Sequence, residues 1–151
     1  MKKFKFSLEK VLEVKEIEEK NIQRRLQKVQ SQIFETENKI FTLSENISTE
    51  GKKVNSMINN IMKSTDIMIH YKYIESLCDQ LNSLKAHLRD LRVDEEQITA
   101  ELVEKSKEKK AIERLKEIKY EEYRKEYNKE QQTILDEISI QSHRLKVGSV
   151  S

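Results

Sequence analysis

Three histidines and one cysteine are the side chains of this sequence best suited to metal binding or nucleophilic catalysis. His70, His87 and His143 stand far apart and form no H-E-x-x-H motif, in which two histidines one helical turn apart bind zinc. Cys78 has no second cysteine to pair with, which suits a reducing compartment, and we expect it to be a small residue on the flank of a helix. We therefore predict no metal centre.

Nucleotide binding and acid–base catalysis are disfavoured by spacing as well. Gly51 and Gly148 stand alone, so the sequence has no glycine-rich loop of the kind that holds phosphates. Carboxylates are plentiful, but along two long helices they face water and lack the cavity that would shift their pKa values. Glu95 falls in an expected core slot, where a polar residue sets the register of a coiled coil. We predict no enzymatic activity, no catalytic residue and no cofactor.

The charge of the chain is nearly balanced, with 29 basic and 27 acidic residues, so no strong field attracts nucleic acid. The stretch Lys105 to Lys110 is interrupted by a serine and a glutamate, and we expect it to be a solvated helix face. The N-terminus begins with basic residues but turns charged again at Glu9 and Lys10, unlike a signal peptide. No stretch approaches the roughly 20 apolar residues of a membrane span. We expect a cytoplasmic protein with no inserted segment and no nucleic-acid partner.

Long helices are the elements that this composition favours. Charged residues make up 37% of the chain and apolar residues 36%, and there is no proline, so apolar surface can be buried only as a narrow stripe. Such a stripe begins at Leu8 and alternates in steps of four and three, which is the spacing of a left-handed coiled coil. Its slots are Leu8, Leu12, Lys15, Glu19, Ile22, Leu26, Val29, Ile33, Thr36, Ile40, Leu43, Ile47, Glu50, Val54, Met57 and Ile61.

A second stripe follows after the polar run Met62 to Asp66, whose side-chain oxygens suit a turn. Its slots are Ile74, Leu77, Leu81, Leu84, Leu88, Leu91, Glu95, Ile98 and Leu102. The chain is thus predicted to be all-α, a long antiparallel two-helix coiled-coil hairpin whose second helix is longer than the first. We expect one domain over residues 1–147, with helices at about 7–62 and 67–145, a turn at about 63–66 and a flexible tail over 148–151. Ser7 is the expected N-cap of the first helix.

The two helices are unequal in length. If the turn centres near residues 64 and 65, Leu8 lies opposite about Glu121, and the second helix has no partner after roughly Tyr127. The unpaired end still carries apolar residues at helical spacing, which usually marks a binding surface, although fraying is an alternative. These residues are Ile134, Leu135, Ile138, Ile140 and Leu145. Phe34 and Phe41, seven residues apart beside core slots, are expected to pack on the flank of the coil.

Three short motifs resemble those of one protein family. The segment Phe4 to Glu16 reads FKFSLEKVLEVKE and resembles the F-x-F-x-L-x-x-[LV]-L-x-x-[KR]-E start of the flagellar FliJ family. Tyr71 to Leu77 is similar to that family's Y-x-x-[FY]-[IV]-x-x-L segment, although the first tyrosine lies one residue closer. Leu135 to Gln141 resembles its [LM]-D-[DE]-I-[SA] ending.

The resemblance implies a non-enzymatic stalk in the flagellar type III export apparatus, and hence a role in motility and chemotaxis. Its expected partners are the export ATPase ring, the cytoplasmic domain of the membrane export gate and export chaperones. The protein would be a monomer when isolated and would work in the cytoplasm at the inner face of the cell membrane. The resemblance places gate binding on Tyr71, Tyr73, Ile74 and Leu77. Ring binding is expected at the terminal ends, on Phe4, Phe6, Ile134, Leu135, Asp136, Glu137, Ile138 and Ile140.

Three alternatives remain open at this point. The first is the equivalent stalk of a virulence type III secretion system, which would have a similar architecture in a different machine. The second is a generic scaffold or tether that dimerises through its long seams. The third is a helical nucleic-acid-binding protein, against which the balanced charge argues.

Overall fold

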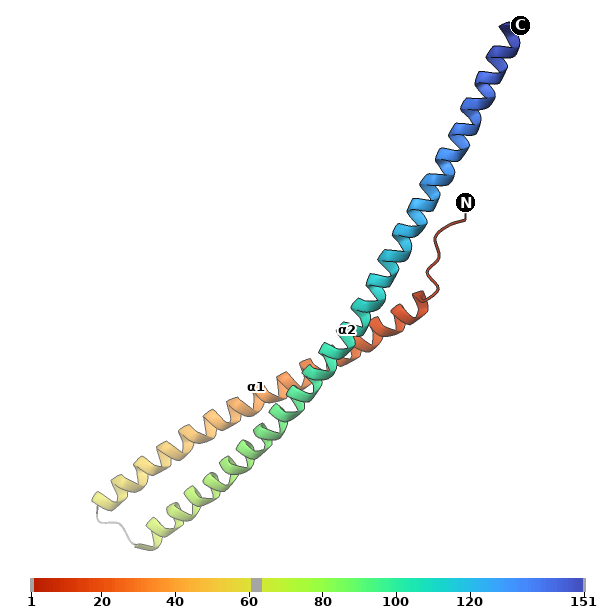
Figure 1. The fold of residues 1–151 in the computed structure, drawn as a ribbon. Coiled ribbons are helices and arrows are strands. Elements are labelled where there is room, and N and C mark those ends of the chain that lie inside the picture. The colour runs from red at the N-terminus through yellow and green to blue at the C-terminus, as the bar shows by residue number, and fades with distance from the viewer. Residues whose placement is uncertain (1, 61–63, 151) are drawn as a thin grey trace. The chain divides into compact units, whose positions relative to one another are not determined.

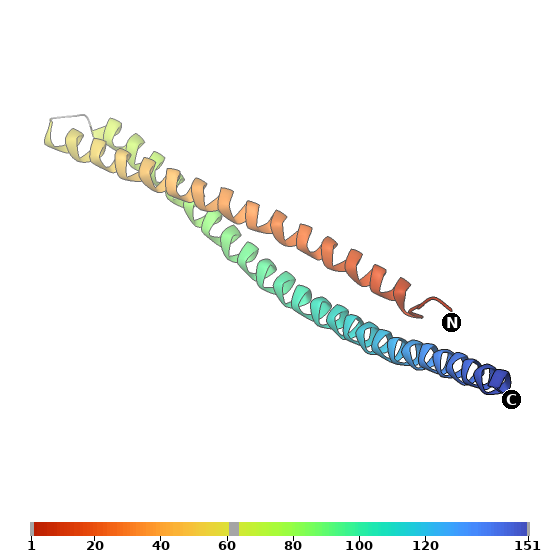
Figure 2. The ribbon, with the colours of Figure 1, turned by 90° about the horizontal axis from the view of Figure 1, so that it is seen from above.

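The structure, a computed structural model, describes residues 2–60 and 64–150, and this part of the chain contains two helices. Helix α1 spans Glu9–Asn59 and helix α2 spans Ser64–Val150 (Figure 1). The two helices run in opposite directions and pack against each other as a hairpin (Figures 1 and 2). The predicted all-α hairpin with a longer second helix is therefore confirmed.

Helix α1 begins after a short turn. The N–H of Glu9 donates to the carbonyl of Phe6 at 3.1 Å, and the N–H of Leu12 donates to the carbonyl of Leu8 at 2.9 Å. Because the carbonyl of Leu8 accepts this bond just ahead of the helix, Leu8 takes the cap position that we expected for Ser7.

The connection between the helices differs from the expected one. Ser64 to Asp66, which we expected in the turn, form the first turn of α2, where the Asp66 carboxylate suits the positive end of the helix dipole. Ile61, the last predicted slot of the first seam, lies outside the described residues, as do residues 62 and 63. At its other end α2 continues to Val150, past the predicted end near residue 145 and into the expected tail.

The chain divides into two compact units, each of which contains a segment of both helices. Unit 1 comprises Met1–Glu19 and Glu104–Ser151, and unit 2 comprises Lys20–Val103. Unit 2 contains most of the buried apolar side chains, and all of them come from the two predicted seams: Ile22, Leu43, Val54, Leu77, Leu91 and Ile98. The hydroxyl of the buried Thr36 donates to the Gln32 carbonyl at 2.7 Å, which satisfies a polar group in this core.

The register of both seams is confirmed, because every described slot is buried or half-buried. The pairing of the helices in unit 1 is shifted by about one helical turn from the predicted one. Glu9 pairs with Lys116, with Nζ to Oε2 at 2.8 Å, whereas we had placed the adjacent Leu8 opposite Glu121. The prediction was wrong because α2 begins at Ser64, so the same stretch of α1 meets an earlier part of α2.

Phe34 and Phe41 lie on the outside of α1 and are each 66% exposed. The expected packing on the flank is wrong, because each follows a seam residue and turns about 100° away from the single covered stripe. Along residues 2–60 and 64–150, neither helix has an apolar stretch long enough to cross a lipid bilayer.

Candidate functional site

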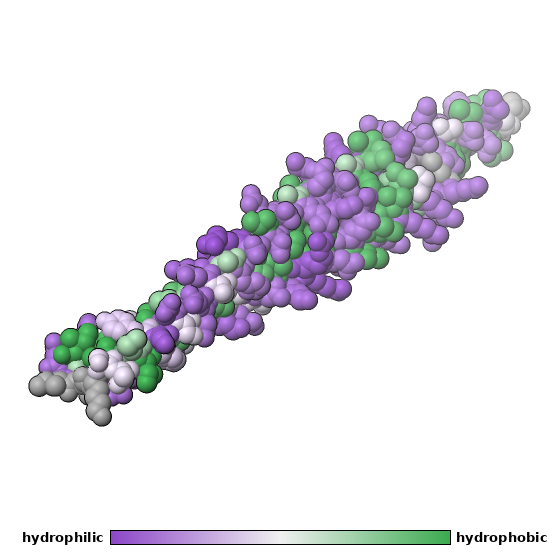
Figure 3. Space-filling model, turned by 90° about the horizontal axis from the view of Figure 1, so that it is seen from below, coloured by the Kyte–Doolittle hydropathy of each residue, from purple (hydrophilic) through white to green (hydrophobic). Residues whose placement is uncertain are grey.

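Hydrophobic side chains are exposed beside the connection between the helices, in unit 2. We call this the hairpin-end surface, and its members are Ile58, Met68, Ile69, Tyr71 and Tyr73. Hydrophilic residues cover most of the face drawn in Figure 3, and hydrophobic ones are seen at this end next to the grey residues as well as farther along the same face. A cluster of exposed apolar and aromatic side chains of this kind is typical of a protein-binding surface.

The four expected gate-binding residues have unequal access to a partner. Tyr71 and Tyr73 are 53% and 51% exposed, whereas Ile74 is half-buried and Leu77 is only 6% exposed. Leu77 therefore packs in the core of unit 2, and the two tyrosines are the side chains available for binding. Ile58, Met68 and Ile69 were not among the expected site residues. The sequence could have indicated them, because they are apolar residues that lie next to the turn and outside the seam slots.

A second exposed surface lies on the last part of α2, in unit 1. We call residues 124–148 the C-terminal overhang, because all of them are exposed. The expected apolar residues lie here in the open, and Val147 joins them: Ile134, Leu135, Ile138, Ile140, Leu145 and Val147. Asp136 and Glu137 are also exposed, and an oxygen of Asp136 accepts a hydrogen bond from the Gln132 amide at 3.0 Å.

Phe4 and Phe6, the other residues expected at the ATPase ring, belong to an arm of residues 2–8 that precedes α1. The ring of Phe4 lies 5.3 Å from that of Tyr120 and 5.5 Å from that of Tyr123. The Tyr123 hydroxyl donates to the backbone carbonyl of Lys2 at 2.9 Å. Tyr123 precedes Ile134 by eleven residues, about 16 Å along α2. The structure thus places Phe4 on the tyrosines of α2 and not beside the apolar residues of the overhang.

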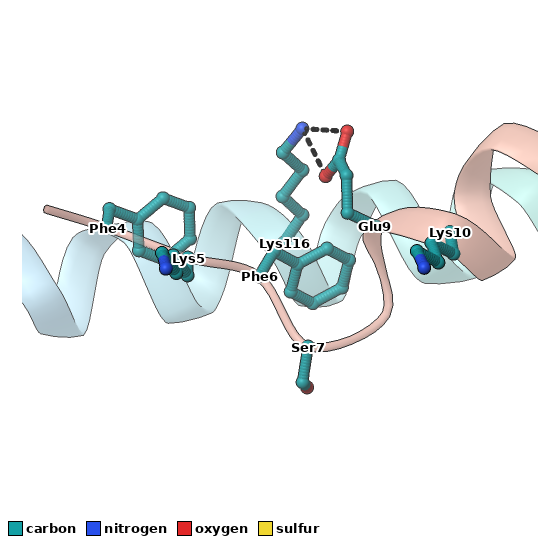
Figure 4. Close-up of a pocket in the computed structure, with 7 residues that line it drawn as sticks. All are labelled: Phe4, Lys5, Phe6, Ser7, Glu9, Lys10 and Lys116. Carbon is teal, nitrogen blue, oxygen red and sulfur yellow. Dashed lines mark hydrogen bonds and ion pairs between the residues drawn. The ribbon is translucent and has the colours of Figure 1, made fainter.

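Figure 4 shows how the arm lies along α2. Phe4 and Phe6 face the helix, the stem of Lys116 passes the Phe6 ring, and Ser7 points away. These residues border an open groove of about 520 Å³ with Glu9 on its rim. A second groove of about 690 Å³ is bordered by Phe4, Tyr123 and the lysines of the arm.

Ion pairs join α1 to α2 in unit 1, and they were not predicted from the sequence. Lys15 lies 2.8 Å from Glu108, Lys105 lies 3.1 Å from Glu18, and Lys109 lies 3.1 Å from Glu19. Lys105 and Lys109 are thus partly covered by α1, so the expectation of a fully solvated face over Lys105 to Lys110 is wrong. Their partners could not be named from the sequence because cross-helix pairing depends on the register.

The pairing shifts the proton affinity of its members. The hydrogen bond from Lys109 is the main cause that lowers the pKa of Glu19, and the same bond raises the pKa of Lys109. The bond from Lys15 lowers the pKa of Glu108, and the bond to Glu18 raises the pKa of Lys105. All four groups are therefore charged at neutral pH, and the interface in unit 1 is ionic.

Metal ligands are not clustered in the described part of the chain, where no group of three His, Cys, Asp or Glu side chains could hold an ion. In unit 2, His70 lies 3.7 Å from a carboxylate oxygen of Glu50. Cys78 is half-buried on α2. What the geometry offers is a set of exposed helix faces.

Comparison with known proteins supports one family. The family described as Flagellar FliJ protein matches residues 4–148. That range contains both helices almost completely, together with the arm and the two exposed surfaces. Comparisons with curated proteins and with solved structures gave no match. Because the match covers nearly the whole chain, the protein belongs to the FliJ family of flagellar export proteins.

Proposed function

We propose that the protein is a non-enzymatic stalk that links the export ATPase ring to the membrane export gate and escorts export chaperones. The observation that carries this proposal is the C-terminal overhang, a long helix end with exposed apolar residues at helical spacing. Residues such as Ile134 and Ile138 gain stabilisation only when another molecule covers them, so they suit a docking role. Membership of the flagellar family favours this machine over the secretion system of a virulence apparatus.

We assign ring binding to the overhang and gate binding to the hairpin-end surface. Tyr71 and Tyr73 lie near the first turn of α2 and Ile134 to Ile140 near its last turns. A single continuous helix therefore carries both exposed surfaces, which is the arrangement that a link between two partners needs. Asp136 and Glu137 add negative charge to the overhang and would favour a ring lined with basic residues. The isolated protein is proposed to be a monomer, because each seam already has its partner within the chain.

The proposal is tested with the full chain and its purified partners. We expect the protein to bind the purified export ATPase and to raise its rate of ATP hydrolysis. In a separate assay it should bind the isolated cytoplasmic domain of the export gate, which places it at the inner face of the membrane. Absence of both interactions at micromolar concentrations would contradict the stalk role. Binding to export chaperones alone would instead make the protein an escort without a link.

A further inference from the structure

Within each unit the two helices are held together by a different kind of contact. The core of unit 2 is apolar, whereas in unit 1 Leu12 is the one buried hydrophobic residue that the described chain provides. Other seam slots of unit 1, Lys15 and Glu19, carry charges instead, and so do Lys105 and Lys109, which continue the second seam beyond Leu102 at steps of three and four. Ion pairs at a partly exposed interface are screened by salt, whereas apolar burial is not. The two units should therefore respond differently to ionic strength.

The ion pairs of unit 1 attach the first turns of α1 to α2 at intervals along the helix. Glu9 meets Lys116 at 2.8 Å, and Glu19 meets Lys109 at 3.1 Å two to three turns later. Their side chains range from 14% exposed at Glu19 to 44% exposed at Glu9. Each such pair contributes little net stability, because desolvation and side-chain ordering offset most of the attraction.

The arm ahead of α1 is held by equally limited contacts. Residues 2–6 belong to no helix or strand. They contact α2 through the Phe4 ring and one exposed hydrogen bond, and Phe6 faces the helix beside the stem of Lys116. The arm is thus attached by the Phe4 and Phe6 side chains, and the Glu9–Lys116 pair drawn in Figure 4 lies next to them. If the pair opens, little remains to keep the arm in place.

We infer that residues 2–19 form a releasable strap that covers Tyr120 and Tyr123 of α2 and opens while unit 2 stays folded. A detached helix end of this length frays, because packing and not propensity sustains short helical segments in water. Release would uncover more of Tyr120, which is already 47% exposed, and more of the half-buried Tyr123, and these rings stack on toward Tyr127. The exposed face of α2 would then extend from the C-terminal overhang toward the hairpin. The strap is thus a cover over part of α2, and its release can be measured without the partners proposed above.

Hydrogen exchange of the full chain, read by mass spectrometry, tests the strap directly. The exchange is measured at about 0.05 M and about 1 M NaCl, where the Debye length falls to roughly 3 Å. We expect residues 9–19 to exchange about tenfold faster in high salt, while residues 40–54 of the same helix change less than about twofold. Equal exchange of residues 9–19 in both solutions would overturn the inference. A parallel increase in both segments would mean global unfolding and would overturn it as well.

A variant that lacks the Glu19–Lys109 ion pair provides the matched comparison. Glu19→Leu combined with Lys109→Leu replaces the ionic contact by an apolar one, which salt does not weaken. We expect the salt response of residues 9–19 to fall to less than about half of its wild-type size. The control is Arg25→Gln with Glu101→Gln, which removes an exposed ion pair of unit 2 and should leave the response unchanged. A response that persists undiminished in the leucine variant overturns the inference.

A fluorescent arm gives a second measurement that does not depend on the leucine variant. The chain contains no tryptophan, so Phe4→Trp places a single reporter against Tyr120 and Tyr123. Release of the arm moves the indole into water, and we expect its emission to shift to longer wavelength with added NaCl. The helical circular dichroism signal should fall by no more than the fraction of the helical residues that lie in the strap. Emission that stays constant up to about 1 M NaCl would show that the arm remains docked and would overturn the inference.

Discussion

The Nζ atom of Lys109 lies 3.1 Å from Oε1 of Glu19, at slots of the repeat that a conventional coiled coil fills with apolar residues. The Ser106 hydroxyl donates to the other oxygen of the same carboxylate at 3.0 Å. The Glu19 side chain is only 14% exposed and thus lies inside the interface. The bond from Lys109 lowers the pKa of Glu19 most, burial acts in the opposite direction, and Ser106 adds to the lowering.

This pair makes the stability of the protein depend on pH. Because the pKa of folded Glu19 lies below its ordinary value of 4.5, the stabilisation is complete above 4.5 and is lost as the pH falls through the folded pKa. We expect Glu19→Gln to lower the free energy of unfolding by about 1 kcal/mol at pH 7. The difference from the wild type should shrink as the pH falls below 4.5. Urea unfolding of both proteins over a series of pH values measures it.

Glu45→Gln serves as the control for this prediction. Glu45 lies on the exposed face of α1, so its substitution removes a carboxylate without removing a contact between the helices. We expect its unfolding free energy to stay within about 0.5 kcal/mol of the wild type at neutral pH. A Glu19→Gln difference that is the same at every pH would show that the charge of Glu19 does not contribute.

The fold could be predicted because a two-helix coil leaves a simple trace in the sequence. Slots such as Ile22, Leu43 and Leu91 recur at steps of three and four, and the structure buries the side chains at these slots. The pairing of the helices was predicted less well, because it depends on where the turn lies. Ser64 to Asp66 suit a loop and a first helical turn equally. Because the loop was predicted there, the predicted partner of Glu9 lay about one helical turn beyond Lys116, its partner in the structure.

The candidate surfaces, too, could be predicted only in part from the sequence. Exposure of Ile134 and Ile138 followed from counting helix lengths, since the second helix is too long for the first. The Lys109–Glu19 pair could not be predicted, because a charged residue in a slot does not reveal which residue it faces across the interface. The seating of Phe4 on Tyr120 and Tyr123 was hidden for a related reason. The arm lies outside the repeat, so no periodicity indicates its position.

Gly51 offers a test of local helix stability. It lies inside α1, and a Cβ atom built there would have no neighbouring atom within 4 Å. Alanine removes backbone freedom from the unfolded chain without a clash, so Gly51→Ala should raise the free energy of unfolding by about 1 kcal/mol. Urea or thermal unfolding provides the measurement. Gly148→Ala is the matched control, and it should change stability little because the end of α2 contributes little to packing.

Leu77 and Tyr73 separate the core from the hairpin-end surface. Leu77 is buried, so Leu77→Ala should lower the free energy of unfolding by about 2 to 4 kcal/mol. Tyr73 is half exposed, and Tyr73→Ala should change stability by less than about 0.5 kcal/mol. The same variant should bind the cytoplasmic domain of the export gate more weakly. Calorimetric binding and thermal unfolding, measured on one preparation, distinguish the two effects.

Phe41→Ala is the control for gate binding, because Phe41 is an exposed aromatic residue outside the hairpin-end surface. We expect it to bind the gate domain as the wild type does. If Tyr73→Ala also retained wild-type affinity, gate binding would have to be assigned to another face of the protein. A large loss of stability in Tyr73→Ala would instead mean that Tyr73 contributes to the core.

Ile134 and Ile138 test whether the C-terminal overhang binds the ATPase ring. Both are exposed and lie one helical turn apart, so the double change to alanine removes apolar surface that the hairpin does not bury. The melting temperature should therefore stay within a few degrees of the wild type. Burial of two such side chains contributes about 1.5 to 3 kcal/mol each before the entropy of ordering is subtracted. We expect affinity for the purified export ATPase to fall by at least about a hundredfold.

Val93→Ala with Val103→Ala is the matched control, because it trims two exposed β-branched residues of α2 outside the overhang. This control should bind the ATPase and stimulate ATP hydrolysis as the wild type does. If the isoleucine double variant melted far below the wild type, the overhang would contribute to the fold of the isolated chain. If it melted normally and still stimulated hydrolysis, the ring contact would lie elsewhere. Only normal melting combined with lost stimulation identifies Ile134 and Ile138 as a docking surface. Melting reports whether the side chains are buried within the chain, whereas stimulation of hydrolysis reports whether they are buried against the ATPase.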